Sequence, residues 1–234
     1  MLTCDGLRLA QDDFALRADL RLPKGRVTAL IGPSGAGKST LLSALAGFLA
    51  PVAGHIAWDG VDLTDLSPGA RPISILFQDN NLFPHLTVAQ NVGLALRPTL
   101  RLSNTEKAQV AAVLDAVGLT GLGGRKPGAL SGGQQSRAAL ARVLLGDRPV
   151  VLLDEPFAAL GPGLKAEMLD LVRLKLAGPE RLVVMVTHDP DDAKRIADDV
   201  VVVADGHAAA PVATAALFDH PPQALADYLG KRVG

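Results

Sequence analysis

The chain has 234 residues and a mass of 24.2 kDa, which suits one or two domains with a substantial core. Its 23 Lys and Arg nearly balance 24 Asp and Glu, and the formal net charge of -1 excludes a bulk attraction to nucleic acid or acidic lipid. The single cysteine, Cys4, cannot form an intrachain disulfide, and the first residues lack the basic and apolar segments of a secretion signal. We therefore expect a protein of a reducing cytosol.

Two N-terminal segments, residues 2–9 and 14–22, alternate partly between apolar and polar side chains around a turn at 11–13. This pattern predicts an antiparallel sheet edge with one face in water. Five later segments are β-branched or apolar and mostly lack alternation: residues 27–31, 73–77, 150–153, 182–187 and 200–204. Because several of them alternate with helical patterns, we predict an α/β fold with a buried, mostly parallel sheet.

The stretch from residue 39 to residue 58 has 20 residues without Asp, Glu, Lys or Arg, which is the length of a membrane-spanning helix. Glycines and a proline interrupt its second half. We therefore predict a helix over residues 40–48 followed by a strand over 55–58, and no spanning helix.

About seventy residues without a convincing strand separate segments 73–77 and 150–153, which is too long for an ordinary connection. Helical patterns predict an inserted helical subdomain with helices over residues 87–96, 105–117 and 134–145, the second capped by Ser103 or Asn104. A glycine-rich connector covers residues 121–128, and a terminal helix is expected over residues 221–229.

The predicted strand 27–31 leads directly into a P-loop pattern followed by an apolar helix that includes Thr40. The pattern consists of Gly32, Pro33, Ser34, Gly35, Ala36, Gly37, Lys38 and Ser39. Its backbone N–H groups and the helix start can cradle phosphates, Lys38 can reach the terminal phosphates, and the Ser39 hydroxyl can ligate Mg²⁺. The alternative is a glycine-rich turn that matches the pattern by accident. Such a turn would not need to lie between a strand and a helix. We predict a nucleotide-phosphate site.

Two further predicted strands end in polar side chains. Asp154 and Glu155 follow strand 150–153, and His188 follows strand 182–187. Asp154 can face Mg²⁺ opposite Ser39, Glu155 can deprotonate a water that attacks the γ-phosphate, and His188 can hydrogen-bond that phosphate. The alternative interpretations are an acidic loop after the strand and a lone structural histidine. The P-loop pattern favours the functional roles instead.

A second anion-binding pattern precedes the helix predicted over 134–145. It consists of Leu130, Ser131, Gly132, Gly133 and Gln134, which supply small residues at a helix start. Spacing along the chain leaves open whether both patterns serve one phosphate within a chain.

The order of these motifs, with Phe77 and Gln78 between them, resembles the ATP-binding subunit of ABC transporters. The resemblance implies a P-loop NTPase core over residues 1–86 and 146–234, with an antiparallel β edge, and a helical subdomain over 87–145 that carries the signature motif, residues 130–134. It implies that Ser131, Gly132, Gly133 and Gln134 act in trans on ATP held by a second copy in a head-to-tail homodimer. It also implies that Gln78 contacts Mg²⁺ or the attacking water.

Two positions depart from the family pattern. Gly161 stands where the family usually has an aspartate that helps to join the two sites, which leaves open how strongly the sites are coupled. The aromatic residue that stacks on adenine in the family corresponds to a position near Ala10 or Gln11. Phe14 is the only aromatic nearby, and we expect it to be a core side chain rather than an adenine contact.

Residues 77–91 resemble the corresponding segment of bacterial thiamine importers, and only 28 residues follow Gly206, which disfavours an added β-domain. The resemblance implies an ATPase at the cytoplasmic face of the inner membrane that energises import of thiamine or its phosphates. Its partners would be membrane permease subunits and, indirectly, a periplasmic binding protein, with no nucleic acid. The alternatives are a subunit of another importer, for polyamine, metal or anion, and a soluble ABC-type clamp on DNA or ribosomes. A P-loop kinase has no use for residues 130–134.

Overall fold

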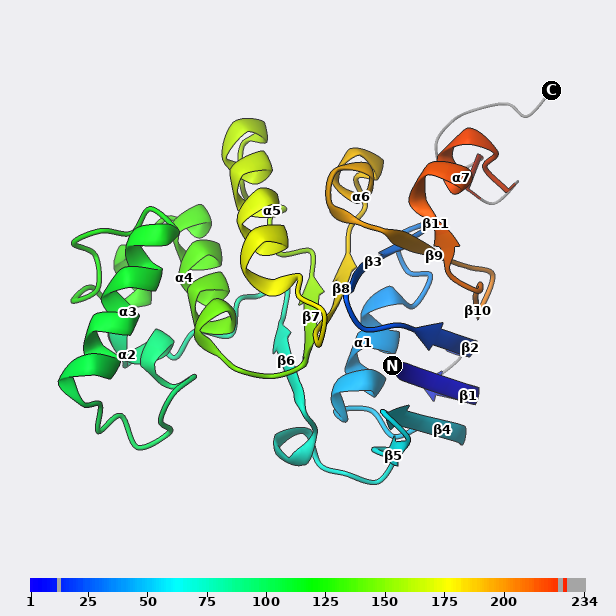
Figure 1. Cartoon of the computed structure of the whole chain (residues 1–234), viewed down its shortest axis with the longest axis horizontal. Helices are drawn as coiled ribbons and strands as arrows, with labels where there is room; N and C mark the ends of the chain where they lie inside the picture. Colours follow the sequence, from blue (N-terminus) through cyan, green and yellow to red (C-terminus); the bar gives the residue numbers. More distant parts are fainter. Residues whose placement is uncertain (12–13, 223–224, 227–234) are drawn as a thin grey trace.

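The computed structural model describes residues 1–11, 14–222 and 225–226, and an eleven-stranded mixed sheet runs through these residues (Figure 1). The strand order is β5-β4-β1-β2-β10-β9-β3-β8-β7-β6, with β11 paired to β9. The strands are β1 (Leu2–Gln11), β2 (Phe14–Leu22), β3 (Arg26–Ile31), β4 (Ala53–Trp58), β5 (Val61–Asp62), β6 (Ile73–Leu76), β7 (Val150–Asp154), β8 (Leu182–Val186), β9 (Asp199–Ala204), β10 (His207–Ala208) and β11 (Val212–Ala213).

The parallel part of the sheet runs through β9, β3, β8, β7 and β6. Every residue of β7 and β8 is buried. The two faces of β7 belong to different cores, since Val150 and Leu152 pack in the cluster that contains α1, whereas Val151 and Leu153 pack in the cluster that contains α4 and α5. Apolar layers on both faces explain why these segments do not alternate, and the predicted α/β fold is confirmed.

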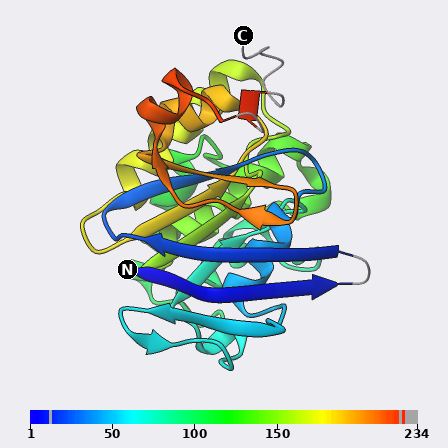
Figure 2. The same cartoon turned by 90° about the vertical axis from the view of Figure 1, so that its right-hand side faces the viewer.

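The N-terminal strands form the antiparallel part, where β1 pairs with β2 and with β4. Burial alternates along β2, as the sequence pattern predicts for a sheet with one wet face. The prediction that these strands form the edge is wrong in one respect, because β4 and β5 extend the sheet beyond β1 (Figure 2). The expected turn includes residues 12–13, which lie outside the described residues.

The helices of the described chain are α1 (Lys38–Ala46), α2 (Val88–Gly93), α3 (Asn104–Ala116), α4 (Gly132–Leu145), α5 (Pro162–Leu176), α6 (Pro190–Ile196) and α7 (Thr214–Asp219). Helix α1 ends at Ala46, and Gly47, with a φ of 87°, forms its left-handed C-cap before β4. None of the described helices is long and apolar enough to cross a membrane. The helix expected over residues 221–229 lies mostly outside the described residues.

Helices α2, α3 and α4 form a separate helical lobe beside β6 and β7, which Figure 1 shows in green on the left. Each of the three helices begins with a capping box, formed by Thr87, Ser103 and Ser131 with the residue three positions later. These caps correct the predicted boundaries. Ser103, not Asn104, caps α3, and α4 starts two residues earlier than predicted because Ser131 is its cap. Helix α2 ends at Gly93 rather than at residue 96.

Candidate functional site

The loop between β3 and α1 has space for glycine alone at two of its positions. A Cβ on Gly32 would lie 1.9 Å from the Val203 carbonyl oxygen, and one on Gly37 would lie 2.3 Å from the Phe14 ring. Their φ values of 152° and 97° are also in the left-handed half of the Ramachandran map. The glycine spacing of the P-loop pattern therefore has a local steric cause in this fold.

Lys38 is buried in this loop. Its Nζ donates hydrogen bonds of 2.8 Å to the carbonyl oxygens of Gly32 and Pro33. Burial lowers the pKa of Lys38, which Glu155 and Asp154 partly offset as neighbouring negative charges. The ammonium thus lacks a full counter-charge in the described chain, and an anion in the loop would supply one.

Ser39 lies in α1, which follows β3, and Asp154 is the last residue of β7. The two residues meet at one edge of the sheet. Ser39 Oγ donates to Asp154 Oδ1 at 3.0 Å. Burial, followed by the charge of Glu155, raises the pKa of Asp154 above its ordinary value, although the Ser39 hydrogen bond lowers it. A hydroxyl and a poorly compensated carboxylate are hard oxygen donors that fit Mg²⁺. Within the described residues, no group of three or more His, Cys, Asp or Glu could hold a metal ion.

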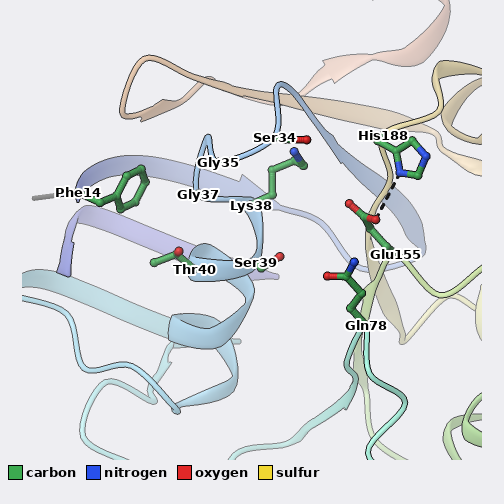
Figure 3. Close-up of a pocket in the computed structure, with 10 residues that line it drawn as sticks. All are labelled: Phe14, Ser34, Gly35, Gly37, Lys38, Ser39, Thr40, Gln78, Glu155 and His188. Carbon is green, nitrogen blue, oxygen red and sulfur yellow. Dashed lines mark ion pairs between the residues drawn. The ribbon is translucent and has the colours of Figure 1, made fainter. Parts of the chain in front are cut away.

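Glu155 turns its side chain toward His188. The φ of Glu155 is 43°, and its backbone N–H donates to the Val186 carbonyl at 3.2 Å. His188 Nδ1 then lies 3.3 Å from Glu155 Oε2 (Figure 3). The sequence predicts a phosphate contact for His188, and the structure adds a contact with the carboxylate expected to act as the base. A left-handed residue at a strand end is a strained conformation of the kind found at functional sites.

Lys38, Ser39, Glu155 and His188 line one pocket with a volume of about 530 Å³. Figure 3 shows the Gln78 amide directed into it from the segment after β6, on the side of Glu155, while Phe14 stands at the opposite end. The lining residues are Phe14, Ser34, Gly35, Gly37, Lys38, Ser39, Thr40, Gln78, Glu155 and His188. Phe14 packs against the core, as expected for a core side chain, but it also lines the pocket.

The signature residues lie elsewhere. Among the described residues, none from α4 lines the pocket, and α4 stands in the helical lobe, apart from α1 (Figure 1). Ser131 and Gln134 bond to each other, with Gln134 N–H donating to Ser131 Oγ at 3.3 Å and Ser131 N–H donating to Gln134 Oε1 at 2.9 Å. Gly132 and Gly133 form the first turn beside them. One chain therefore does not bring its two anion-binding patterns to a common site.

Comparison with known proteins identifies the family. Residues 16–158 match the ABC transporter family. The chain belongs to the ABC transporter family. It is 60% identical to the thiamine import ATP-binding protein ThiQ of Cereibacter sphaeroides and 54% identical to that of Ruegeria sp., in each case over 98% of this chain and 100% of the relative. Its identity to the ThiQ protein of Escherichia coli is 50% over 83% of this chain and 84% of that protein. The resemblance inferred from motif order is confirmed.

A solved ABC structure supports the same conclusion about the fold. It is an ATP-binding cassette in a dimeric post-hydrolysis state, bound to ADP and Pi. The two chains superpose with a TM-score of 0.81 at 28% identity, covering 92% of this chain and 99% of the other. The P-loop NTPase fold expected for an ABC protein is therefore confirmed.

Sequence reasoning missed one connection between the two lobes of this ABC protein. Arg142, near the end of α4, donates to the carbonyl oxygens of Asn80 at 3.1 Å and Asn81 at 2.9 Å. Burial lowers the pKa of Arg142. Both asparagines have positive φ values, 63° and 44°, and they follow Gln78 closely along the chain. The helix that carries the signature motif is thus bonded to the segment that carries Gln78, and nothing in a local pattern predicts a contact over that sequence separation.

Proposed function

We propose that this chain is the ATP-binding and ATP-hydrolysing subunit of a bacterial thiamine importer. The observation that carries the ATPase activity is that Lys38, Ser39, Glu155 and His188 line one pocket, with Asp154 bonded to Ser39. The cargo is supported by 60% identity, over 98% of the chain, to a thiamine import ATP-binding protein.

Nucleotide binding uses the loop and its lysine. The loop N–H groups and Lys38 bind the terminal phosphates, and Lys38 exchanges carbonyl partners for charged oxygens in doing so. Phe14 lines the far end of the pocket, where it offers a ring face or edge to the base. Ser39 and Asp154 would hold Mg²⁺, which would neutralise phosphate charge.

Hydrolysis is assigned to Glu155 as general base. Its carboxylate takes a proton from the water that attacks the γ-phosphorus while the bond to the ADP oxygen breaks. His188 holds one carboxylate oxygen at 3.3 Å and so orients the other toward the pocket. Gln78 contacts the water or Mg²⁺ from the remaining side of the pocket.

The signature residues complete the site from a second copy in a head-to-tail dimer. The exposed start of α4 offers N–H groups and the Ser131 hydroxyl to the phosphate held by a partner's loop. Because the γ-phosphate then bonds to both chains, its release weakens the closed dimer. This opening and closing drives permease subunits at the cytoplasmic face of the inner membrane. A periplasmic binding protein delivers thiamine to the permease without contacting this chain.

The Glu155→Gln variant tests the ATPase proposal. Loss of the base should slow hydrolysis by about 100-fold or more, while ATP still binds and the closed dimer accumulates. Steady-state hydrolysis and light scattering after size exclusion with Mg-ATP measure the two effects. Glu167→Gln, at an exposed position on α5, is the matched control and should behave like the wild type. A Glu155→Gln protein that stays monomeric with ATP while the wild type dimerises would contradict the shared-site dimer.

The cargo needs its own test. Vesicles that carry this subunit with its co-encoded permease and binding protein should accumulate labelled thiamine when ATP is enclosed on the subunit's side. Vesicles with the Lys38→Ala subunit should not. Vesicles that accumulate no thiamine but take up a labelled polyamine or divalent metal with ATP would move the assignment to another importer while leaving the ATPase intact.

A further inference from the structure

Lys165, Asp189 and Asp192 form a cluster next to the Glu155–His188 pair, which we call the cationic clamp. Lys165, in the first turns of α5, donates from Nζ to Asp189 Oδ2 at 2.5 Å and lies 2.7 Å from Asp192 Oδ1. The clamp is partly shielded from water, since the side chain of Lys165 is 21% exposed and that of Asp192 is 12% exposed. Burial lowers the pKa of Lys165, but the hydrogen bonds to the two carboxylates outweigh it and the net shift is upward. The two carboxylates therefore share one firmly charged cation.

The same network holds the backbone on both sides of His188. Thr187 Oγ1 donates to Asp192 Oδ2 at 2.8 Å and accepts the Asp189 N–H at 3.0 Å. Asp189 is fixed a second time, because its Oδ1 accepts the Asp191 N–H at 3.0 Å as the N-cap of α6. Residues 187 and 189 are thus bonded to α5 and α6. Because His188 lies between them, the same bonds restrict its backbone.

His188 lies between the two residues that this network holds. Its side chain is 60% exposed, and its Nδ1 lies 3.3 Å from Glu155 Oε2. The residues that line a small cavity of about 60 Å³ include Glu155, His188, Lys165, Thr187 and Asp192. The clamp and the catalytic pair therefore adjoin each other.

We propose that Lys165 is a positioning residue that, through Asp189 and Asp192, holds His188 in the orientation that contacts Glu155. Helix α5 begins immediately after Gly161, which caps the helix without a side chain, and Lys165 N–H bonds to the Gly161 carbonyl at 2.9 Å. Lys165 is therefore also the residue that connects the start of α5 to the segment after β8. Its effect on turnover rests on the proposed ATPase activity, whereas its effect on the His188 ring does not.

The test uses the full-length protein and two independent readouts. The first is the set of side-chain NMR signals of the five histidines, in which His188→Ala assigns the His188 signals and Glu155→Ala defines their position without the carboxylate contact. The second is kcat and KM for Mg-ATP. In Lys165→Met, the His188 signals should move toward the Glu155→Ala position, kcat should fall about tenfold or more, and KM should stay within about twofold.

Two variants separate positioning from a loss of folding. Lys165→Arg keeps the charge and should restore both readouts toward wild type. Asp189→Asn keeps an oxygen for the α6 cap but weakens the ion pair, so it should reproduce the Lys165→Met effects in a milder form, even if Lys165→Met itself does not fold. Lys194→Met, which removes an exposed ion pair on α6, is the matched control and should leave both readouts unchanged.

Unmoved His188 signals in Lys165→Met, or in Asp189→Asn where Lys165→Met does not fold, would overturn the proposal. An increase in KM at constant kcat would do the same. If wild-type protein hydrolyses no ATP, the proposed function fails, and the NMR readout still decides whether Lys165 positions His188.

Discussion

The edge of the parallel sheet and the exposed start of α4 are both built to bind anions, but their surroundings differ. At the sheet edge, groups from the ends of β3, β7 and β8 bond to one another, as Ser39–Asp154 and Glu155–His188 demonstrate. At the start of α4, the Ser131 and Gln134 side chains bond to each other's backbone N–H groups within the capping box. The first region is a pocket and the second is an open surface. An exposed, preformed anion cap that does not line this pocket suits a shared site between two copies.

The most stringent test of whether these two regions form one site across a dimer is a mixture of two inactive variants. Lys38→Ala removes the cation of the cradle and should lower hydrolysis by about 100-fold or more. Gly132→Asp places a negative charge at the anion-binding start of α4, where a Cβ has open space and an acid suits the helix terminus. Each variant alone should be inactive, but a head-to-tail pair of one of each contains one intact site.

An equal mixture should therefore regain about one quarter of wild-type hydrolysis, since half of random dimers are mixed and each has one good site of two. ATPase assays on the mixture and on the separate proteins measure this. Lys107→Ala, at an exposed position on α3, is the control for the lysine substitution and should retain full activity. A mixture no more active than its components would mean that the two regions do not combine across a dimer.

A smaller effect is expected at the far end of the pocket. Phe14→Ala removes the ring that lines the pocket beside Gly37. If the ring stacks on the base, KM for ATP should rise about 2- to 10-fold with kcat nearly unchanged, because this contact is made equally before and during the reaction. Steady-state kinetics measure the change. Phe218→Ala, on α7 and outside the pocket, should leave KM unaltered. An unchanged KM in Phe14→Ala would leave Phe14 with a packing role only.

The smallest effect concerns stability without nucleotide. Because burial raises the pKa of Asp154 in the folded protein, ionisation of this carboxyl costs folding free energy above that pKa. The cost is absent below the ordinary pKa of 3.8, where the group is protonated in both states. Asp154→Asn should therefore raise Tm at neutral pH, by about 2–4 °C for each kcal/mol relieved, and the gain should shrink as the pH falls toward 4.

Thermal unfolding of the nucleotide-free proteins at several pH values checks this prediction. Asp147→Asn is the control, because that side chain is 99% exposed and its ion pair contributes little. A lower Tm for Asp154→Asn at neutral pH would mean that Ser39 and Lys38 stabilise the carboxylate by more than burial penalises it. The sheet edge would then hold a stable carboxylate without a bound cation.

Much of the sheet edge could be predicted because its chemistry is local in sequence. A β strand followed by Gly32 to Ser39 has few conformations that satisfy its glycines, and polar residues that end parallel strands must meet at one edge. The same reasoning predicted Asp154, Glu155 and His188 as neighbours of the P-loop. Helix ends were predicted less well, since apolar periodicity does not reveal that Ser131 and Gln134 exchange hydrogen bonds as a capping box.

The sequence by itself determined the fold class, the phosphate cradle and the family, because each depends on patterns a few residues long taken in order. Only the tertiary structure decided that His188 contacts Glu155, that Lys165 clamps the segment around His188, and that Arg142 holds the segment after Gln78. These contacts join groups 24 to 62 positions apart in the sequence, and such pairs form only when packed helices and strands bring them within hydrogen-bond distance. No periodicity encodes that distance, so the folded chain had to supply it.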